Sequence, residues 1–204
     1  MSQTDPCVHI VDDDEAVRSG LRLLLASCGL QAQAYPGAQA FLDGVDADRP
    51  GCLLLDVRMP GMSGLELQER LQQRGLLFPV ILLTGHGDVP MAVRAMKRGA
   101  FDFIQKPFND QYLLDRINEA IALDLHERDR RRQQQVLRER LARLSAREQE
   151  VLDRLVQGEA NKVIAAELGI SERTVELHRA RVMEKMEARS LAQLVQSIAE
   201  LRRG

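Results

Sequence analysis

Residues 52–64 read CLLLDVRMPGMSG, and this stretch predicts the fold of the first half of the chain. An unbroken apolar run leads directly into Asp56, and Pro60, Gly61 and Gly64 follow closely. A short apolar run that ends in turn-forming residues is typical of a buried parallel strand followed by a loop. A carboxylate there lies at the carboxyl edge of an open α/β sheet, where such folds bind ligands. Taken alone, Asp56 could equally be a loop aspartate or a helix cap.

The other apolar runs of the first half also end in polar residues. Residues 8–11 precede Asp12, Asp13 and Asp14, residues 80–83 precede Thr84, and residues 100–104 precede Gln105 and Lys106. A weaker run at residues 31–35 alternates small and polar residues, which predicts a strand at the sheet edge. Helical spacing separates the runs, so we expect a parallel sheet with right-handed crossovers. The carboxyl ends of parallel strands meet at one edge, where these polar side chains should converge.

This combination of side chains has a chemical logic. Asp12, Asp13 and Asp56 cannot all remain ionised at close range without a cation. Oxygen ligands of this density suit Mg²⁺, and an aspartate carboxylate can form an aspartyl-phosphate. Lys106 would supply positive charge and Thr84 a hydroxyl donor to the phosphoryl oxygens. Considered singly, Lys106 could also be a solvated surface lysine, and Thr84 could also be a strand-end cap.

Four segments resemble the motifs of response-regulator receiver domains, in order and at the expected spacing. They are VDDDEAVR (11–18), LLLDVRMPGMSGLEL (53–67), ILLTGHGD (81–88) and FDFIQKPF (101–108). The resemblance covers residues 1–124 and implies an α/β flavodoxin-like domain with a five-stranded parallel sheet. It also implies a cis bond between Lys106 and Pro107.

The resemblance further implies a role for each strand-end residue. The implied set is Asp56 as phosphoacceptor, Lys106 as phosphate-binding lysine, Asp12, Asp13, Asp56 and the main-chain carbonyl of Arg58 as Mg²⁺ ligands, and Thr84 with Phe103 as the switch pair. Asp14 is expected to cap the following helix instead of binding metal. His86 is expected to be a solvent-facing loop histidine.

From about Tyr112 to Leu144 the chain contains no Gly or Pro, and this run predicts helix. Apolar spacing marks the inner face of the last receiver helix, and then the pattern turns polar at HERDRRRQQQ, residues 126–135. That run could bind nucleic acid, but a solvated helix surface is the favoured interpretation. We therefore expect a helical linker over residues 125–141.

The last third predicts an all-α domain over residues 142–204. Ser145 and Glu148 form a capping-box pattern, Gly169 and Ser171 mark a tight turn, and Ser190 can cap a last helix. Two short helices that meet at such a turn fit a helix-turn-helix. LSAREQEVL, GEANKVIAAELGISERTVELHRARVMEKM and SLAQLV resemble the four-helix LuxR-type DNA-binding domain. With both halves, the chain resembles FixJ/NarL-type transcription factors, and the FixJ branch more closely.

In that architecture the third helix enters the major groove. The candidate DNA-binding residues are Thr174, Glu176, Leu177, His178, Arg179, Ala180, Arg181 and Lys185. Glu176, Leu177 and Ala180 align with groove-facing positions, and the donors and charges could reach phosphates. Glu176 opposes phosphate charge, so either it accepts from cytosine N4, or it is a solvent-facing residue or a partner for Arg179 or Arg173.

The two halves of the chain differ in charge, the first being acidic and the second basic. Residues 1–125 carry 11 Lys/Arg against 17 Asp/Glu, whereas residues 126–204 carry 17 against 13, which suggests a polyanionic partner for the second half. Cys7, Cys28 and Cys52 have no metal-ligand spacing and are expected to be small core residues. No apolar run approaches the roughly 18 residues of a membrane span. We expect a cytoplasmic protein without a membrane partner.

The resulting hypothesis is a two-component response regulator. A sensor histidine kinase would phosphorylate Asp56, and the change would promote homodimerisation, release of the C-terminal domain, or both, for binding to double-stranded promoter DNA. RNA polymerase is a possible further partner, and catalysis would be limited to the receiver's own phosphoryl transfer and dephosphorylation. The residues expected in a symmetric dimer contact are Met91, Arg94, Ala95, Lys97 and Asp115.

Two alternatives belong to other classes. Asp12 and Asp14 after an apolar strand loosely resemble the nucleophile motif of haloacid-dehalogenase-type phosphatases. That family needs a later G-D-x-x-x-D motif, and Gly87 and Asp88 begin one that ends in Ala92 instead. The other alternative is an adaptor that has kept a receiver without signalling.

Overall fold

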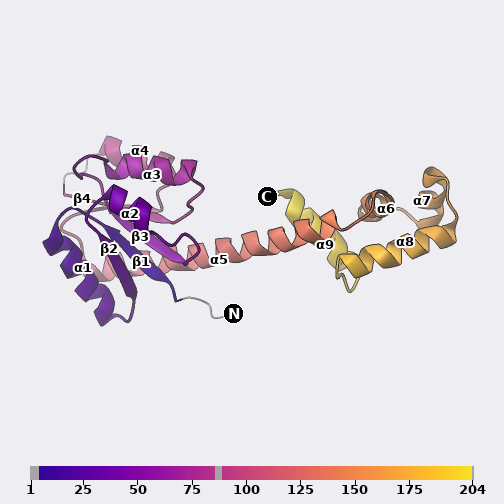
Figure 1. The fold of residues 1–204 in the computed structure, drawn as a ribbon, viewed down its shortest axis with the longest axis horizontal. Helices are drawn as coiled ribbons and strands as arrows, with labels where there is room; N and C mark the ends of the chain where they lie inside the picture. Colours follow the sequence, from indigo (N-terminus) through magenta and orange to yellow (C-terminus); the bar gives the residue numbers. More distant parts are fainter. Residues whose placement is uncertain (1–4, 86–88, 204) are drawn as a thin grey trace. The chain divides into compact units, whose positions relative to one another are not determined.

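The computed structural model describes residues 5–85 and 89–203. His86, Gly87 and Asp88 lie outside the described residues. The chain separates into two compact units, Met1–Arg128 and Asp129–Gly204, and each is considered by itself (Figure 1). Among the described residues, no helix is long and apolar enough to cross a membrane.

The first unit alternates strands and helices. Its elements are β1 (Cys7–Val11), α1 (Glu15–Ser27), β2 (Gln31–Tyr35), α2 (Ala38–Gly44), β3 (Gly51–Asp56), α3 (Gly64–Gln73), β4 (Val80–Thr84), α4 (Val89–Lys97), β5 (Asp102–Gln105) and the start of α5 (Asp110–Ala142). The sheet is parallel, with strand order β2-β1-β3-β4-β5. This confirms the predicted flavodoxin-like sheet and the edge position of residues 31–35.

The starts of β3 and β5 differ from the prediction. β3 begins at Gly51, one residue before the predicted stretch, because this residue pairs with Cys7 of β1. A Cβ on Gly51 would lie 1.8 Å from the Cys7 carbonyl oxygen, so only glycine fits. β5 begins at Asp102 instead of residue 100, and just before it the Phe101 N–H donates to the Val80 carbonyl oxygen at 2.8 Å.

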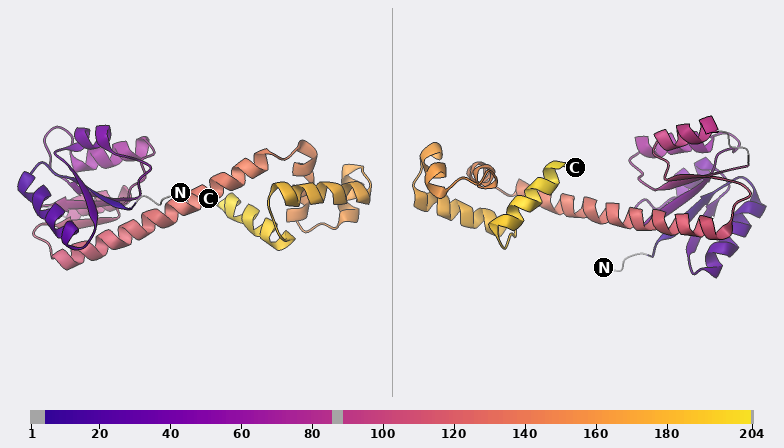
Figure 2. Two further views of the ribbon diagram at one scale, coloured as in Figure 1. Left: turned by 60° about the horizontal axis from the view of Figure 1, so that its bottom comes forward. Right: turned by 180° about the vertical axis from the view of Figure 1, so that it is seen from behind.

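Helices cover both faces of the sheet (Figure 2). Along β3, alternate residues point to opposite faces. Leu53 and Leu55 pack in the cluster that includes residues of α2 and α3, whereas Cys52 and Leu54 pack in the cluster that includes residues of α1 and α5. β1, β3 and β4 are buried throughout, as strands covered on both sides should be. The prediction for Cys28 is wrong: it caps the end of α1 and is exposed.

α5 continues without a break from Asp110 to Ala142. Leu113, Ile117 and Ile121 form its buried face in the first unit, as the apolar spacing predicts. Leu137 and Leu141 pack against the core of the second unit. The polar run of residues 126–135 is therefore helical.

The second unit contains α6 (Ala146–Val156), α7 (Asn161–Leu168), α8 (Glu172–Lys185) and α9 (Leu191–Arg203). Both bonds of the predicted capping box are present: the Ser145 N–H donates to Glu148 Oε2 at 2.8 Å, and the Glu148 N–H donates to Ser145 Oγ at 3.3 Å. Gly169 ends α7 with φ 65°, and Ser171 caps α8. This geometry forms the predicted helix-turn-helix from α7 and α8.

Candidate functional site

The ammonium of Lys106 joins two carboxylates at the carboxyl edge of the sheet. Its Nζ donates to Asp12 Oδ2 and to Asp56 Oδ1, each at 2.7 Å. Both acids are buried, at 2% and 8% exposure, at the ends of the adjacent strands β1 and β3. Burial alone would lower the pKa of Lys106, but its hydrogen bonds to both carboxylates outweigh this effect and raise the pKa. Lys106 is therefore the cation that the crowded acids require in this structure.

The loop after β3 closes tightly around Asp56. The Arg58 N–H donates to Asp56 Oδ2 at 2.6 Å. The chain then returns at Gly64, whose N–H donates to the Val57 carbonyl at 3.0 Å. A Cβ on Gly64 would lie 2.3 Å from the Asp56 carbonyl oxygen, so this approach requires glycine. Ser63 and Glu66 form a capping box that starts α3 at this point.

The three aspartates of the turn after β1, Asp12, Asp13 and Asp14, have different environments. Asp14 caps α1 and accepts from the Ala16 N–H at 2.8 Å, as predicted. Asp12 Oδ1 accepts from the Asp14 N–H at 2.9 Å, and Asp13 is exposed at the same turn. The cap role of Asp14 speaks against the phosphatase alternative, which would need this carboxylate at a reacting centre.

The sequence prediction missed Arg18, which is buried behind this turn. Its Nη1 donates to the Asp12 carbonyl oxygen at 2.6 Å, and Nη2 pairs with Glu15. One signal was available: Arg18 precedes Leu21 by three residues and Leu25 by seven, so it lies on the apolar face of α1.

Thr84 and Phe103 come from the two neighbouring strands β4 and β5. Thr84 is buried at 1% exposure, and its carbonyl oxygen accepts from the Lys106 N–H at 2.7 Å. Phe103 is half-buried, lies opposite Leu82 and packs against the core. The bond between Lys106 and Pro107 is cis, as the family resemblance implies.

The oxygen donors at this edge fit Mg²⁺ in their chemistry. Two buried carboxylates already share one cation, and Asp13 follows Asp12 on the same turn, where it is exposed. Carboxylate and carbonyl oxygens are the ligands that Mg²⁺ prefers, with water completing its shell. Within residues 5–85 and 89–203, no three acidic, histidine or cysteine side chains converge as a ready-made metal cage. Ligation would therefore require the Asp12 and Asp56 carboxylates to exchange their contacts with Lys106.

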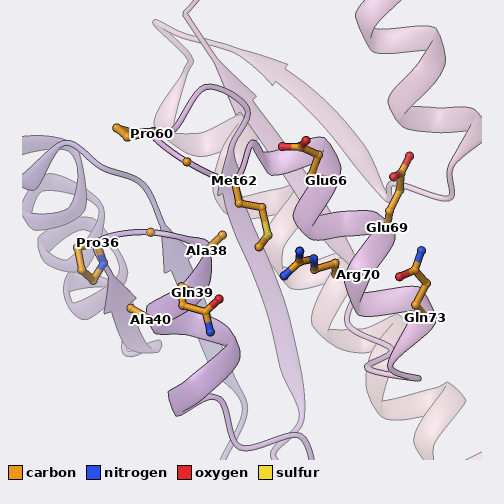
Figure 3. Close-up of a pocket in the computed structure, with 12 residues that line it drawn as sticks. Pro36, Ala38, Gln39, Ala40, Pro60, Met62, Glu66, Glu69, Arg70 and Gln73 are labelled. Carbon is orange, nitrogen blue, oxygen red and sulfur yellow. The ribbon is translucent and has the colours of Figure 1, made fainter.

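An open groove of about 770 Å³ lies between the turns that follow β2 and β3 and one side of α3. Figure 3 shows Met62 and Arg70 beside this space, with Gln39 facing them from α2. The residues that line it do not include Asp12, Asp56 or Lys106, so it is separate from the strand-end cluster.

The α8 surface carries most of the predicted DNA-binding residues. Glu176, Leu177, Ala180 and Arg181 are exposed, and Leu177 reaches 57% exposure. Thr174, His178 and Arg179 are half-buried: the Thr174 hydroxyl bonds with Ser171 Oγ at 2.8 Å, and Arg179 Nη1 donates to Asn161 Oδ1 at 3.3 Å. Glu176 and Ala180 are four residues apart and so lie on one helix face.

Lys185 has a different environment from the other predicted DNA contacts. Its ammonium donates to Glu148 Oε2 at 2.6 Å and to the Arg143 carbonyl at 3.1 Å. Glu148 is 3% exposed, and the hydrogen bond from Lys185, with that from Ser145, lowers the pKa of Glu148 to about 2. We therefore assign Lys185 to the internal structure of this unit and leave it out of the proposed DNA contacts.

Comparisons with known proteins agree with both units. Residues 8–118 match the family described as response regulator receiver domain, and residues 142–198 match the luxR family of bacterial regulatory proteins. The transcriptional regulatory protein FixJ of Azorhizobium caulinodans is 51% identical over 189 residues, which span 92% of this chain and 89% of that protein. The response regulator protein TodT of Pseudomonas putida F1 is 43% identical, spanning 99% of this chain and 89% of that protein.

Solved structures show the same similarity. The response regulator StyR superposes with a TM-score of 0.88 at 46% identity, covering 97% of this chain and 100% of StyR. Full-length FixJ from B. japonicum gives a TM-score of 0.59 at 43% identity, covering 98% of this chain and 99% of that chain.

The receiver sheet and the helix-turn-helix together define a transcriptional response regulator. The chain belongs to the family of response regulators that carry a LuxR-type DNA-binding domain, the family that includes FixJ. Membership implies a histidine kinase as partner of the first unit and DNA as partner of the second. Receiver domains generally use Mg²⁺ for phosphorylation.

Proposed function

We propose that a sensor histidine kinase phosphorylates Asp56 and so controls DNA binding by the second unit. The observation that carries this proposal is the contact of Lys106 with both Asp12 and Asp56 at the strand ends. This contact brings together the proposed nucleophile Asp56, the positive charge of Lys106 and the proposed metal ligand Asp12. The proposed division is a receiver over residues 1–124, a linker over 125–141 and a DNA-binding domain over 142–204.

In the transfer step, an Asp56 carboxylate oxygen forms a bond to phosphorus while the bond from phosphorus to the kinase histidine breaks. Lys106 neutralises charge on the phosphoryl oxygens, and the Thr84 hydroxyl donates to them. Asp12, Asp13, Asp56 and the Arg58 carbonyl would hold Mg²⁺, which supplies further charge neutralisation when bound. Slow hydrolysis in the same pocket would return the receiver to its resting state, so the chemistry serves as a switch.

The output step is proposed to begin at Thr84 and Phe103. A phosphoryl group adds about −1.5 to −2 charges, enough to attract Lys106 and the Thr84 hydroxyl. Movement of Thr84 would leave room for Phe103 to turn inward and alter the surface of α4 and β5. Val89, Val93 and Met96 already form an exposed apolar stripe on α4.

This stripe supports a symmetric dimer contact on phosphorylation. Ala95 does not belong to that contact, because it is fully buried on the core-facing side of α4. The dimer would place two α8 helices on successive turns of promoter DNA, and RNA polymerase would be a further partner. Action on promoter DNA would place the protein in the cytoplasm.

The test of the acceptor uses acetyl phosphate and MgCl₂ with the full chain. Mass spectrometry should find one base-labile phosphoryl group on the wild type and none on Asp56→Asn. Asp13→Ala should slow labelling at limiting Mg²⁺. Undiminished labelling of Asp56→Asn would place the acceptor elsewhere. Sedimentation velocity beside DNA titration then separates dimerisation from release of the second unit, since release predicts tighter DNA binding by a monomer.

A further inference from the structure

We propose that Arg18 is a positioning residue for Mg²⁺ binding, because it holds the main chain of the turn that carries Asp12 and Asp13. The inference rests on the proposed Mg²⁺ site. The inference gives a role to the buried guanidinium of Arg18, which takes no part in the proposed phosphorylation chemistry.

The contacts of Arg18 are directed at the main chain of this turn. Its side chain is 10% exposed, and Nη1 donates to the Asp12 carbonyl oxygen at 2.6 Å. Its other terminal nitrogen pairs with Glu15, which also pairs with Arg22 at 3.0 Å. A guanidinium held from two sides is a rigid donor, since its planar fork has little freedom left. The Asp12 carbonyl is therefore fixed in direction.

Asp12 is held at every polar atom. Its N–H donates to the Tyr35 carbonyl at 3.4 Å, and its carboxylate accepts from the Asp14 N–H at 2.9 Å and from Lys106 Nζ at 2.7 Å. Arg18 holds the remaining atom, the carbonyl oxygen. Without Arg18, a buried acceptor would lose its partner, and rotation of the peptide between Asp12 and Asp13 toward water would relieve that cost. Such a rotation would move both carboxylates away from a shared metal.

Electrostatics alone predicts the opposite change in Mg²⁺ affinity when Arg18 is replaced, which makes the inference testable. Arg18 carries a permanent positive charge near the proposed metal, so removal of that charge alone would strengthen Mg²⁺ binding. Loss of positioning weakens it instead, and residues that orient metal ligands typically change metal affinity by about 10–100-fold. The direction of the change therefore separates the two roles.

The experiment titrates the full chain with MgCl₂ in a calorimeter, without phosphodonor. Arg18→Met should weaken Mg²⁺ binding by about 10–100-fold. Arg18→Lys should recover part of the loss, because an ammonium can still donate to the Asp12 carbonyl. Arg22→Met is the matched control: it also loses a pairing with Glu15 but leaves Asp12 untouched, so its affinity should stay within about twofold.

Thermal unfolding with and without MgCl₂ gives a second measure of Mg²⁺ affinity. A ligand that binds the folded state raises the melting temperature, and tighter binding raises it more. If Arg18→Met does not fold, Arg18→Lys and Arg18→Gln carry the comparison. A folded Arg18→Met that binds Mg²⁺ as well as the wild type, or more tightly, overturns the inference. Failure of the wild type itself to bind Mg²⁺ would overturn the proposed metal site as well, so the two failures are distinguishable.

Discussion

Asp124 and Arg128, one turn apart on α5, connect this helix to the first residue of β3 and to the loop before it. Asp124 Oδ2 accepts from Arg128 Nε at 2.7 Å and from the Gly51 N–H at 2.9 Å. Arg128 Nη1 in turn donates to the carbonyls of Ala47 and Asp48, at 3.0 and 3.1 Å. These contacts reach four residues past the predicted end of the receiver at residue 124. Arg128 is thus held by the receiver, and we infer that it is unavailable to nucleic acid.

Loss of Arg128 should loosen this end of α5. Arg128→Ala leaves the buried Asp124 carboxylate without its charged partner, so we expect the first unit to lose about 2 kcal/mol of stability. Denaturant unfolding measures the loss, and hydrogen exchange of residues 122–130 should speed up. Arg132→Ala, an exposed residue on the same helix, should change stability by less than about 0.5 kcal/mol. Equal losses from both variants would contradict this role.

His9 should make the first unit sensitive to mild acid. It lies buried among Tyr35, Phe41 and Phe78, at ring distances of 6.0, 5.7 and 5.2 Å, and burial lowers its pKa from 6.5 to about 4. Between pH 6.5 and 4, His9 therefore binds a proton in the unfolded chain but stays neutral in the folded unit. Protonation thus favours the unfolded chain, and the stability of the first unit falls as pH falls through this window. The shift corresponds to a loss on the order of 3 kcal/mol.

The measurement for His9 is the denaturation midpoint between pH 7.5 and 4.5. His9→Met should remove the proton-linked slope and leave the remaining pH dependence unchanged. A variant with the same slope as the wild type would assign the proton to another group.

The ion pair between Glu148 and Lys185 should respond in a different pH range. The pKa of Glu148 is about 2 in the folded unit and lies near 4.5 ordinarily, so its contribution is complete above pH 4.5 and is lost as pH falls toward 2. Lys185→Met should destabilise the second unit at pH 7 by about 1–3 kcal/mol. Circular dichroism during unfolding measures this. The salt dependence of DNA binding should not change, and a smaller slope would instead show that Lys185 contacts phosphate.

The exposed residues of α8 should divide into two groups on DNA. Arg181→Ala should weaken binding to all sequences and reduce the salt slope by about 1, as loss of one phosphate contact does. Glu176→Gln and Leu177→Ala should instead alter sequence preference. Titrations of specific and random duplexes at several salt concentrations separate these effects. Uniform loss across all duplexes for every variant would argue against base reading by Glu176 and Leu177.

Removal of the shared cation should make the first unit depend on Mg²⁺. In Lys106→Met, the Asp12 and Asp56 carboxylates face each other without the ammonium, so we expect a lower melting temperature without metal. MgCl₂ should restore more stability in this variant than in the wild type. Lys97→Met, which changes an exposed lysine on α4, should show neither effect. An unchanged melting temperature in Lys106→Met would mean that the carboxylates relax without a cation.

The sequence predicted most of the elements, because their signals are local. The apolar run before Asp56, the capping box of Ser145 and Glu148, and the cap at Ser171 all depend on residues within a few positions of one another. The order of motifs also placed Asp12, Asp56, Thr84 and Lys106 at one sheet edge, since parallel strands share their carboxyl ends. The roles assigned to these residues stay predictions.

Contacts between distant positions were decided by tertiary structure alone. Lys106 and Asp12 are 94 residues apart, Arg128 and Ala47 81 residues, and Lys185 and Glu148 37 residues. A charged residue carries the same sequence signal whether it faces solvent, DNA or a buried partner, so the sequence did not show that Lys185 pairs with Glu148 or that Arg128 pairs with Asp124. Burial distinguishes these cases, because a charge removed from water must find a partner, and only the folded chain shows which partner is within reach.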